Sequence, residues 1–322
     1  MKRQQIRDIL KKRHELLKNI RTFFYDRGYI EVETANLMRT APPDPYIDPL
    51  NVYIGSHGPF FLHTSPEMGM KKLLASGHKR IFQICKVYRV EEHEEIHNTE
   101  FTMLEWYREG TYIEAMRETN ELISSVAGNL LREEGWPYQG PFSIYDLETL
   151  FREKTGINPF GLERNELFEQ MKAKGFAGID DRDDLSSLFF KLFIQEIEDT
   201  MERDAPYFIK DWPKLVSTMA KEKDGDPAKV ERFELYMHGL EIANGYTELI
   251  DPAAQRKRFL KDNEERRKLN KDTFNIDEEF LAALSKLSGT FAGVSVGVDR
   301  LLMALLGADR IDDVMPGRFR QT

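Results

Sequence analysis

The chain has 322 residues, of which 41% are hydrophobic, and it carries a formal net charge of −9. This hydrophobic content can fill a sizeable core, whereas the acidic balance argues against an extended nucleic-acid-binding surface, because such surfaces are normally basic. The single cysteine, Cys85, excludes an internal disulfide. No apolar run approaches the ~20 residues of a membrane span, and the basic N-terminus has no signal-peptide core. We therefore expect a soluble, cytoplasmic protein.

The first third of the chain predicts a long helix followed by short strands. In chain order, the expected elements are a helix at 6–27 that Gly28 ends, a strand at 29–34, a loop at 35–59, a strand at 60–64, a helix from Pro66 to Gly77, and strands at 81–89 and 100–107 joined by a charged loop at 90–99. The last two strands should form a hairpin-like pair with an unusually long tip.

The rest of the chain predicts a mostly helical middle and then strands again. Its expected elements are helices at 112–133, 165–175 and 184–202, strands at 232–238 and 240–249 with the second interrupted at Asn244-Gly245, helices at 252–269 and 277–286, a strand at 292–298 and a helix at 299–306. Hairpins and helical insertions, rather than regular strand–helix–strand units, join most of the strands. We therefore predict an antiparallel sheet flanked by helices, which is the α+β class.

Alternation along the strand at 100–107 puts Phe101, Met103, Glu105 and Tyr107 on one face. An aromatic ring, an acid and a phenol together suit a site that stacks a flat ring and binds a cation. A structural sheet face with one glutamate that is hydrogen-bonded within the protein explains the same pattern equally well.

Two further clusters carry polar or small residues. Glu234, Glu241, Asn244 and Glu248 lie on adjacent predicted strands, and carboxylates with an amide oxygen suit Mg²⁺, although a solvated edge hairpin is the commoner meaning of this spacing. In the strand from Gly293, small residues at alternate positions clear one face for a flat ligand, and Arg300 at its end can stack on a ring or neutralise phosphate.

Taken together, the order and separation of these clusters resemble the three motifs of class II aminoacyl-tRNA synthetases. The motif-like segments are motif 1 at about 20–35, motif 2 at about 82–107 and motif 3 at about 292–306, with a helical insertion at about 112–203. Thr64–Glu67 and Glu241–Leu249 resemble the lysine branch. The likeness covers 6–315, so we expect one catalytic domain over 1–322.

The lysine-branch tRNA enzymes carry an anticodon-binding barrel before motif 1, and here motif 1 begins too close to Met1 to leave room for it. This truncation, together with Phe82–Cys85, Leu104–Arg108 and Asp181–Leu185, resembles the elongation factor P–lysine lysyltransferase family. The resemblance implies that lysine or (R)-β-lysine is activated with ATP and Mg²⁺ and transferred to a lysine of elongation factor P. It also implies a homodimer built through motif 1, no anticodon recognition and no membrane association.

The resemblance also assigns roles to individual residues. Arg89 and Arg300 are the expected catalytic residues. ATP would be bound by Arg89, Glu91, His97, Phe101, Glu234 and Arg300, with Phe101 and Arg300 on either side of the adenine and Glu234 and Glu241 holding Mg²⁺. The substrate amino acid would be bound by Ser65, Glu67, Tyr107, Glu241, Asn244, Glu248 and Ser295, with Glu67 at its nearer amine and Glu248 and Tyr107 at its distal ammonium.

Several positions depart from the family pattern. Ala35 replaces a proline of motif 1, the motif 2 loop is acidic from Glu91 to Glu95, and Ser295 stands where related enzymes have glycine or alanine. These departures leave two alternatives open. One is an adenylate-forming enzyme with another acceptor, such as a tRNA, a small molecule or a carrier protein. The other is a regulatory paralogue without turnover.

Overall fold

The computed structural model describes residues 3–90, 95–133, 135–138, 140–201, 203–216 and 219–317. Its centre is an eight-stranded sheet in the order β1-β5-β6-β13-β12-β11-β8-β7. These strands are β1 (Ile30–Glu31), β5 (Arg80–Tyr88), β6 (Glu100–Glu109), β7 (Ser143–Asp146), β8 (Tyr207–Lys210), β11 (Arg232–Met237), β12 (Leu240–Thr247) and β13 (Phe291–Gly297).

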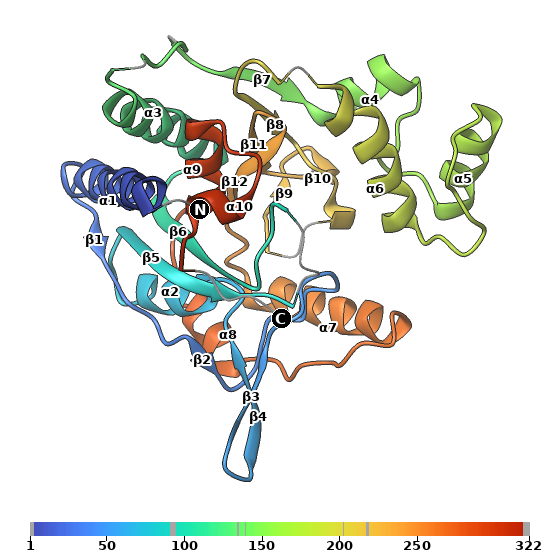
Figure 1. Ribbon diagram of the computed structural model, residues 1–322. Helices are drawn as coiled ribbons and strands as arrows, with labels where there is room; N and C mark the ends of the chain where they lie inside the picture. The colour runs from blue at the N-terminus through green and yellow to red at the C-terminus, as the bar shows by residue number, and fades with distance from the viewer. Residues whose placement is uncertain are drawn as a thin grey trace.

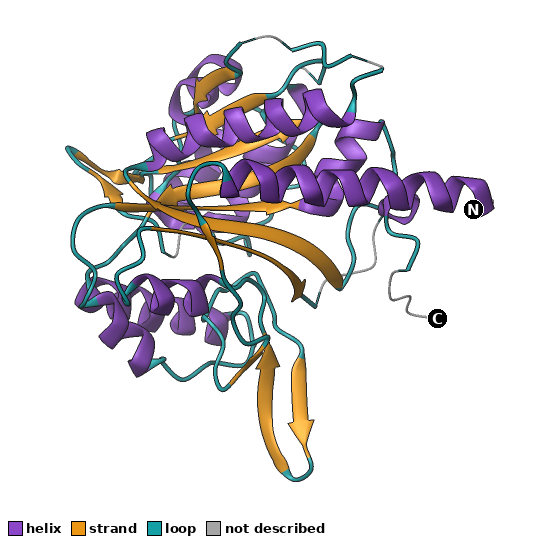
Figure 2. Ribbon diagram, turned by 90° about the vertical axis from the view of Figure 1, so that its left-hand side faces the viewer, coloured by secondary structure: helices purple, strands orange, loops and turns teal. Residues whose placement is uncertain are grey.

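Helices cover this sheet in several groups (Figures 1 and 2). They are α1 (Arg3–Tyr25), α2 (Glu67–Leu74), α3 (Tyr112–Leu130), α4 (Leu147–Thr155), α5 (Arg164–Ala173), α6 (Leu185–Glu196), α7 (Pro252–Lys268), α8 (Glu278–Leu284), α9 (Val298–Leu306) and α10 (Ile311–Val314). The largest apolar core unites α1, α3 and α9 with the sheet, and a second core unites α4–α6 with the sheet's β7–β8 side. In the described ranges, no helix has the length and apolar character to cross a bilayer.

The sheet confirms the α+β prediction, with one difference at its edges. In the order of the sheet, the neighbouring strands β5-β6-β13-β12-β11-β8 all pair antiparallel. At the two edges, β1 pairs with β5, and β7 pairs with β8, in parallel. The sheet is therefore mixed rather than antiparallel throughout. The segment 112–203, predicted as one helical insertion, is not helical throughout and not all of it is an insertion. Its first helix, α3, packs in the main core, and β7 is a strand of the sheet.

The loop predicted at 35–59 is wrong. This segment contains β2 (Leu37–Met38) and β3 (Asn51–Ile54), which pair with β4 (His57–Leu62), and the β3–β4 hairpin projects from the body (Figures 1 and 2). Its proline and glycine content suggested an irregular loop, but Gly55 adopts a positive φ in the hairpin's turn and Gly58 adopts one within β4.

The predicted break at Asn244-Gly245 is also wrong, because β12 runs through both residues. A Cβ at Gly245 would come within 2.6 Å of the Phe233 ring, so close packing, rather than a turn, requires the glycine. The register of the β11–β12 pair shifts instead between Leu235 and Tyr236 of β11.

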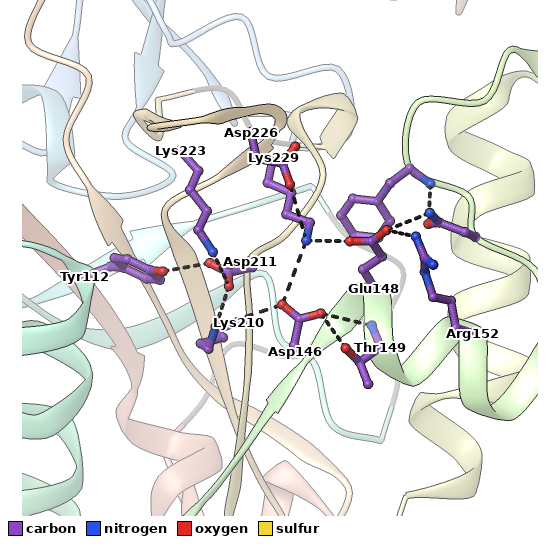
Figure 3. A network of polar contacts seen from close by, with 12 residues as sticks. Tyr112, Asp146, Glu148, Thr149, Arg152, Lys210, Asp211, Lys223, Asp226 and Lys229 are labelled. Atoms are coloured by element: carbon purple, nitrogen blue, oxygen red, sulfur yellow. Dashed lines mark hydrogen bonds and ion pairs between the residues drawn. The ribbon is translucent and has the colours of Figure 1, made fainter.

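A buried polar network fixes the hairpin of β9 (Glu222–Lys223) and β10 (Asp226–Val230) against β7, β8 and α4 (Figure 3). Asp211, which is fully buried, accepts hydrogen bonds from Tyr112 Oη and Lys223 Nζ, both at 2.7 Å. Lys229 Nζ of β10 lies 2.6 Å from Glu148 Oε2 of α4. Just before β9, Met219 O accepts a hydrogen bond from Leu249 N, which lies beyond the end of β12.

Candidate active site

Two adjoining cavities open on the sheet, with volumes of about 470 and 210 Å³. The first is called here the large cavity and the second the small cavity. Both are lined by Ile47, Arg89, Met103, Arg232, Asn244 and Ser295, so these residues form the junction between them. β6, β12 and β13 each contribute side chains to both cavities, because alternate residues of a strand lie on one face.

The large cavity combines a flat ring with a guanidinium group. Phe101 enters it from β6, and Arg300 enters it from the first turn of α9. Arg300 Nη1 donates to the backbone oxygen of Glu241 at 3.3 Å and lies 3.8 Å from its carboxylate, while Nη2 contacts His97 Nε2. These contacts fix the guanidinium where it can face a planar or anionic ligand.

Carboxyl groups also line the large cavity. Glu234 is buried, and it accepts hydrogen bonds from Arg232 Nη2 at 2.5 Å and from Tyr236 Oη at 2.6 Å. Burial raises the pKa of Glu234 to about 8, an effect that Arg232 opposes and Glu241 adds to. Burial and Glu241 likewise raise the pKa of Glu198. This region therefore holds more acid than its cations neutralise.

That imbalance suits a divalent cation that shares its ligands with a phosphate. Mg²⁺ is usually held by one or two carboxylates together with substrate phosphates, rather than by an all-protein cage. Glu234 and Glu241 offer such a pair of hard oxygen donors in one cavity. Within the described ranges, no group of three potential metal ligands is assembled.

The small cavity is lined by acids and phenols with linked hydrogen bonds. Glu105 is buried, and it accepts from Ser65 Oγ at 2.7 Å and from Tyr107 Oη at 2.6 Å. Ser65 Oγ in turn accepts from the backbone N of Glu67 at 3.0 Å. Burial raises the pKa of Glu105 to about 7, and the charge of Glu67 adds to the rise. Glu248 is buried as well, and burial raises its pKa to about 8.

A buried lysine stands behind these acids. Lys71 Nζ lies 2.5 Å from Glu67 Oε1 and forms an ion pair with Glu248 Oε2. Tyr246 Oη donates to the same Glu67 oxygen at 2.5 Å. Burial alone would lower the pKa of Lys71, but the charges of Glu248 and Glu67 outweigh it and the pKa is raised. Lys71 is therefore a fixed cation inside an acidic pocket.

Two arginines meet at the junction. Arg89 lies over the Phe101 ring, with its guanidinium carbon 5.2 Å from the ring centroid, and Nε donates to Thr64 O at 3.2 Å. Arg232 lies 4.8 Å from the Trp212 centroid, donates from Nε to Asn244 Oδ1 at 3.2 Å, and donates from Nη1 to Val216 O at 2.7 Å. An anionic group at this point would face positive charge from both sides.

The structure brings most of the predicted site residues together. The large cavity is lined by His97, Phe101, Glu234, Glu241 and Arg300; the small cavity by Ser65, Glu67, Tyr107 and Glu248; and the junction by Arg89, Asn244 and Ser295. Glu91 lies outside the described residues. The acidic motif 2 loop is described only from Glu95 onward.

Sequence reasoning missed Lys71, Tyr246, Arg232 and Glu198 as parts of the site, and it proposed Glu105 as an acid of a cation-binding face without assigning it to a particular group of the substrate. Signals existed for three of them. Lys71 follows Glu67 by four residues, which places both on one helix face. Tyr246 alternates with Asn244 and Glu248, and Arg232 alternates with Glu234, so each shares a strand face with a predicted residue.

Comparison with known proteins gives a family for the whole chain. The family model for tRNA synthetases class II (D, K and N) matches residues 1–316. The chain is 37% identical over 311 residues to the elongation factor P–(R)-beta-lysine ligase of Haemophilus influenzae (strain PittGG), a match that covers 95% of this chain and 93% of that protein. Proteins with the same name from Haemophilus ducreyi (36% identity, 95% and 92% coverage) and Avibacterium paragallinarum (37%, 94% and 92%) are similar to it over the same extent.

Proposed function

Because the chain belongs to the class II tRNA synthetase family of the D, K and N enzymes, we propose that it uses ATP to activate lysine or (R)-β-lysine as an aminoacyl-adenylate, and that it transfers the aminoacyl group to a lysine side chain of elongation factor P. The observation that carries this proposal is the junction. Arg89 and Arg232 lie where a ring-stacking cavity meets a cavity lined by acids.

ATP would occupy the large cavity. Its adenine would stack between Phe101 and Arg300, and His97 and Arg89 would face the phosphates. Glu234 and Glu241 would hold Mg²⁺ against the phosphates, where the cation supplies charge neutralisation for the leaving pyrophosphate. The raised pKa of Glu234, about 8, supports this assignment, since a carboxyl group that is costly to ionise alone gains most from a nearby cation.

The amino acid would occupy the small cavity with its carboxylate at the junction. Glu67 and Glu105 would accept from the amine nearer the carboxylate, while Glu248 and Tyr107 would face the distal ammonium. Asn244 and Ser295, at the junction, would lie beside the carboxylate. Buried acids require cationic partners, and a diamino acid supplies two of them.

Activation then needs alignment more than acid–base chemistry. A carboxylate oxygen attacks the α-phosphorus, the bond to the pyrophosphate oxygen breaks, and the aminoacyl-adenylate forms. Arg89 and Arg300 would stabilise the negative charge on the phosphate oxygens during this step. In the second step, the neutral amine of the acceptor lysine attacks the carbonyl carbon, AMP leaves, and the amine loses a proton as the amide forms.

Mass spectrometry of elongation factor P tests the transfer directly. Incubation with this protein, ATP, Mg²⁺ and (R)-β-lysine or α-lysine should add one aminoacyl group to one lysine of elongation factor P. If the protein catalyses lysine-dependent pyrophosphate exchange but leaves elongation factor P unmodified, the acceptor is a different molecule. If it catalyses neither reaction, the regulatory alternative is correct.

Each chain should form one catalytic domain, and two chains should associate as a homodimer. The segment from α1 to β1 exposes Leu10, Tyr25 and Ile30, and a two-fold contact would bury such apolar side chains. Light scattering should give twice the chain mass of 37.6 kDa at micromolar concentration. A monomer at every concentration would exclude this assembly. Ala35, which replaces a proline of motif 1, would then be the first position to change back to proline.

A further inference from the structure

Lys71 lies directly behind the acids that line the small cavity. Its side chain is 1% exposed, and its ammonium group contacts both Glu67 and Glu248 while lying 3.8 Å from Met219 Sδ. Glu67 and Lys71 belong to α2, whereas Glu248 follows β12, so the lysine joins a helix to the sheet. Three segments of the chain, α2, the residue after β12 and the segment at Met219, therefore converge on a single buried positive charge.

The charges of the small cavity divide into two groups. At the closed end, three carboxyl groups (Glu67, Glu105 and Glu248) face one ammonium group, that of Lys71. Near the junction, the charges of Arg89 and Arg232 act on the half-buried Asp44, and Arg232 also pairs with Glu234 of the large cavity. Among the described residues, the three acids around Lys71 therefore exceed its single charge by two. A substrate with two ammonium groups balances that excess.

One oxygen of Glu248 remains available to a ligand. Oε2 is paired with Lys71, but Oε1 has no hydrogen-bond partner among the described residues although it is buried. Oε1 lies beside Tyr107 and so close to Gly293 that a Cβ there would collide with it, and both of those residues line the small cavity. A buried, unpartnered carboxylate oxygen in a cavity wall indicates a cationic ligand.

We propose that Lys71 is a positioning and specificity-determining residue: its ammonium neutralises one of the three acids and holds Glu67 and Glu248 together, so that the small cavity accepts two ammonium groups and no more. This inference rests on the proposed function and adds a residue to it. Without Lys71, the closed end has three acids for two substrate cations, and the acids repel one another. The charge of Glu67 already raises the pKa of Glu248, and Lys71 opposes that rise.

The test compares Lys71→Met with a matched control, Lys72→Met. Lys72 is the next residue of α2, and it is also paired, lying 2.7 Å from Asp277 Oδ2, but its partners Asp277 and Glu279 do not line the small cavity, whereas the partners of Lys71 do. We expect Lys71→Met to raise the KM for lysine about a hundredfold in pyrophosphate exchange, with the KM for ATP changed less than about threefold. Lys72→Met should change neither.

A second variant separates charge balance from mere folding. Lys71→Met with Glu67→Gln removes one positive and one negative group, so the closed end again has two acids in excess. If charge balance is the role of Lys71, this double variant binds lysine more tightly than Lys71→Met, measured by calorimetry, although it lacks one more native group. Lys71→Arg, which keeps the charge, should remain within about tenfold of the wild type.

Each outcome decides the question. An unchanged KM for lysine in folded Lys71→Met overturns the inference, as does a double variant that binds lysine no better than Lys71→Met or fails to fold. An unfolded Lys71→Met together with a folded, lysine-binding double variant supports it. If the wild-type protein shows no lysine-dependent exchange, the proposed function fails instead, so the two failures are distinguishable.

Discussion

The large and small cavities meet at Arg89 but differ in how far some of their charged side chains reach solvent. In the large cavity, Arg300 is 22% and Glu241 38% exposed, although Glu234 and Asp299 are buried. At the small cavity, the side chains of Lys71 and Glu248 are each 1% exposed. Water therefore screens Arg300 and Glu241 more than it screens Lys71 and Glu248, so one charge more or less should matter more at the Lys71–Glu248 pair.

This difference predicts two kinds of response to mutation. Losses in the large cavity should reduce the chemical step, because its arginines act on charge that develops during adenylate formation. Losses in the small cavity should reduce binding of the amino acid while ATP binding remains nearly intact. The following predictions use this contrast, from the largest expected effect to the smallest.

Arg300→Ala should lower lysine-dependent pyrophosphate exchange by about three orders of magnitude or more, because in the proposed site the guanidinium would both stack on the adenine and neutralise phosphate charge. The effect should be on kcat as well as on the KM for ATP, with lysine binding by calorimetry retained. Arg310→Ala is a suitable control, since Arg310 is an exposed arginine paired with Glu95 and does not line the cavities. Normal exchange in Arg300→Ala would show that the adenine assignment is wrong.

Glu248→Gln should raise the KM for lysine about a hundredfold, because an amide cannot neutralise a desolvated ammonium and leaves Lys71 with a single acid. ATP affinity should change little. Glu278→Gln tests for general charge effects, since Glu278 is paired with Arg256 on the surface. If Glu248→Gln weakened ATP binding and lysine binding equally, the two cavities would not bind separate ligands as proposed.

Lysine affinity should depend on pH because the empty small cavity contains carboxyl groups with raised pKa values, about 7 for Glu105 and about 8 for Glu248. Both must ionise to receive ammonium groups, so lysine binding should strengthen from pH 6 to pH 8, by up to about tenfold per pH unit for each of the two groups. Binding at pH 7 should also release protons, which calorimetry in buffers of different ionisation enthalpy measures. Proton uptake, or affinity independent of pH, would contradict these ionisation states.

Ser295→Gly should have the smallest effect. Ser295 lies at the junction, with Oγ donating to Asn244 O at 3.3 Å, and not beside Glu248, where Gly293 is found. Its hydroxymethyl group would therefore crowd the α-carbon side of the substrate. Removing it should shift the ratio of exchange rates with α-lysine and (R)-β-lysine severalfold toward α-lysine. If the ratio is unchanged, Ser295 does not set selectivity.

The sequence predicted the parts of the site that depend on strand alternation. Phe101, Met103, Glu105 and Tyr107 line the two cavities because a period of two fixes which residues share a face. Glu234 was found in the same way, whereas the role of Asn244 came from the family resemblance. These features are local, so a single strand contains the information needed to predict them.

The features that the sequence did not predict depend on contacts between distant segments. Lys71 becomes part of the site only because α2 packs where Glu248 leaves the sheet, a separation of 177 residues in the chain. The pairing of β7 with β8 likewise joins segments on either side of α4–α6. The β3–β4 hairpin was missed for a different reason. The proline and glycine residues of 35–59 favoured a loop more strongly than the short β3 pattern favoured a strand.

Pyrophosphate exchange with a set of amino acids tests the central claim, that a ring-stacking cavity and a doubly acidic cavity meet at Arg89 to activate a diamino acid. We predict ATP–pyrophosphate exchange with α-lysine or (R)-β-lysine, and exchange at least about a hundredfold weaker with norleucine, which matches the length of lysine but lacks the distal ammonium. Exchange that is equal with norleucine and lysine, or absent with both forms of lysine, would contradict the account.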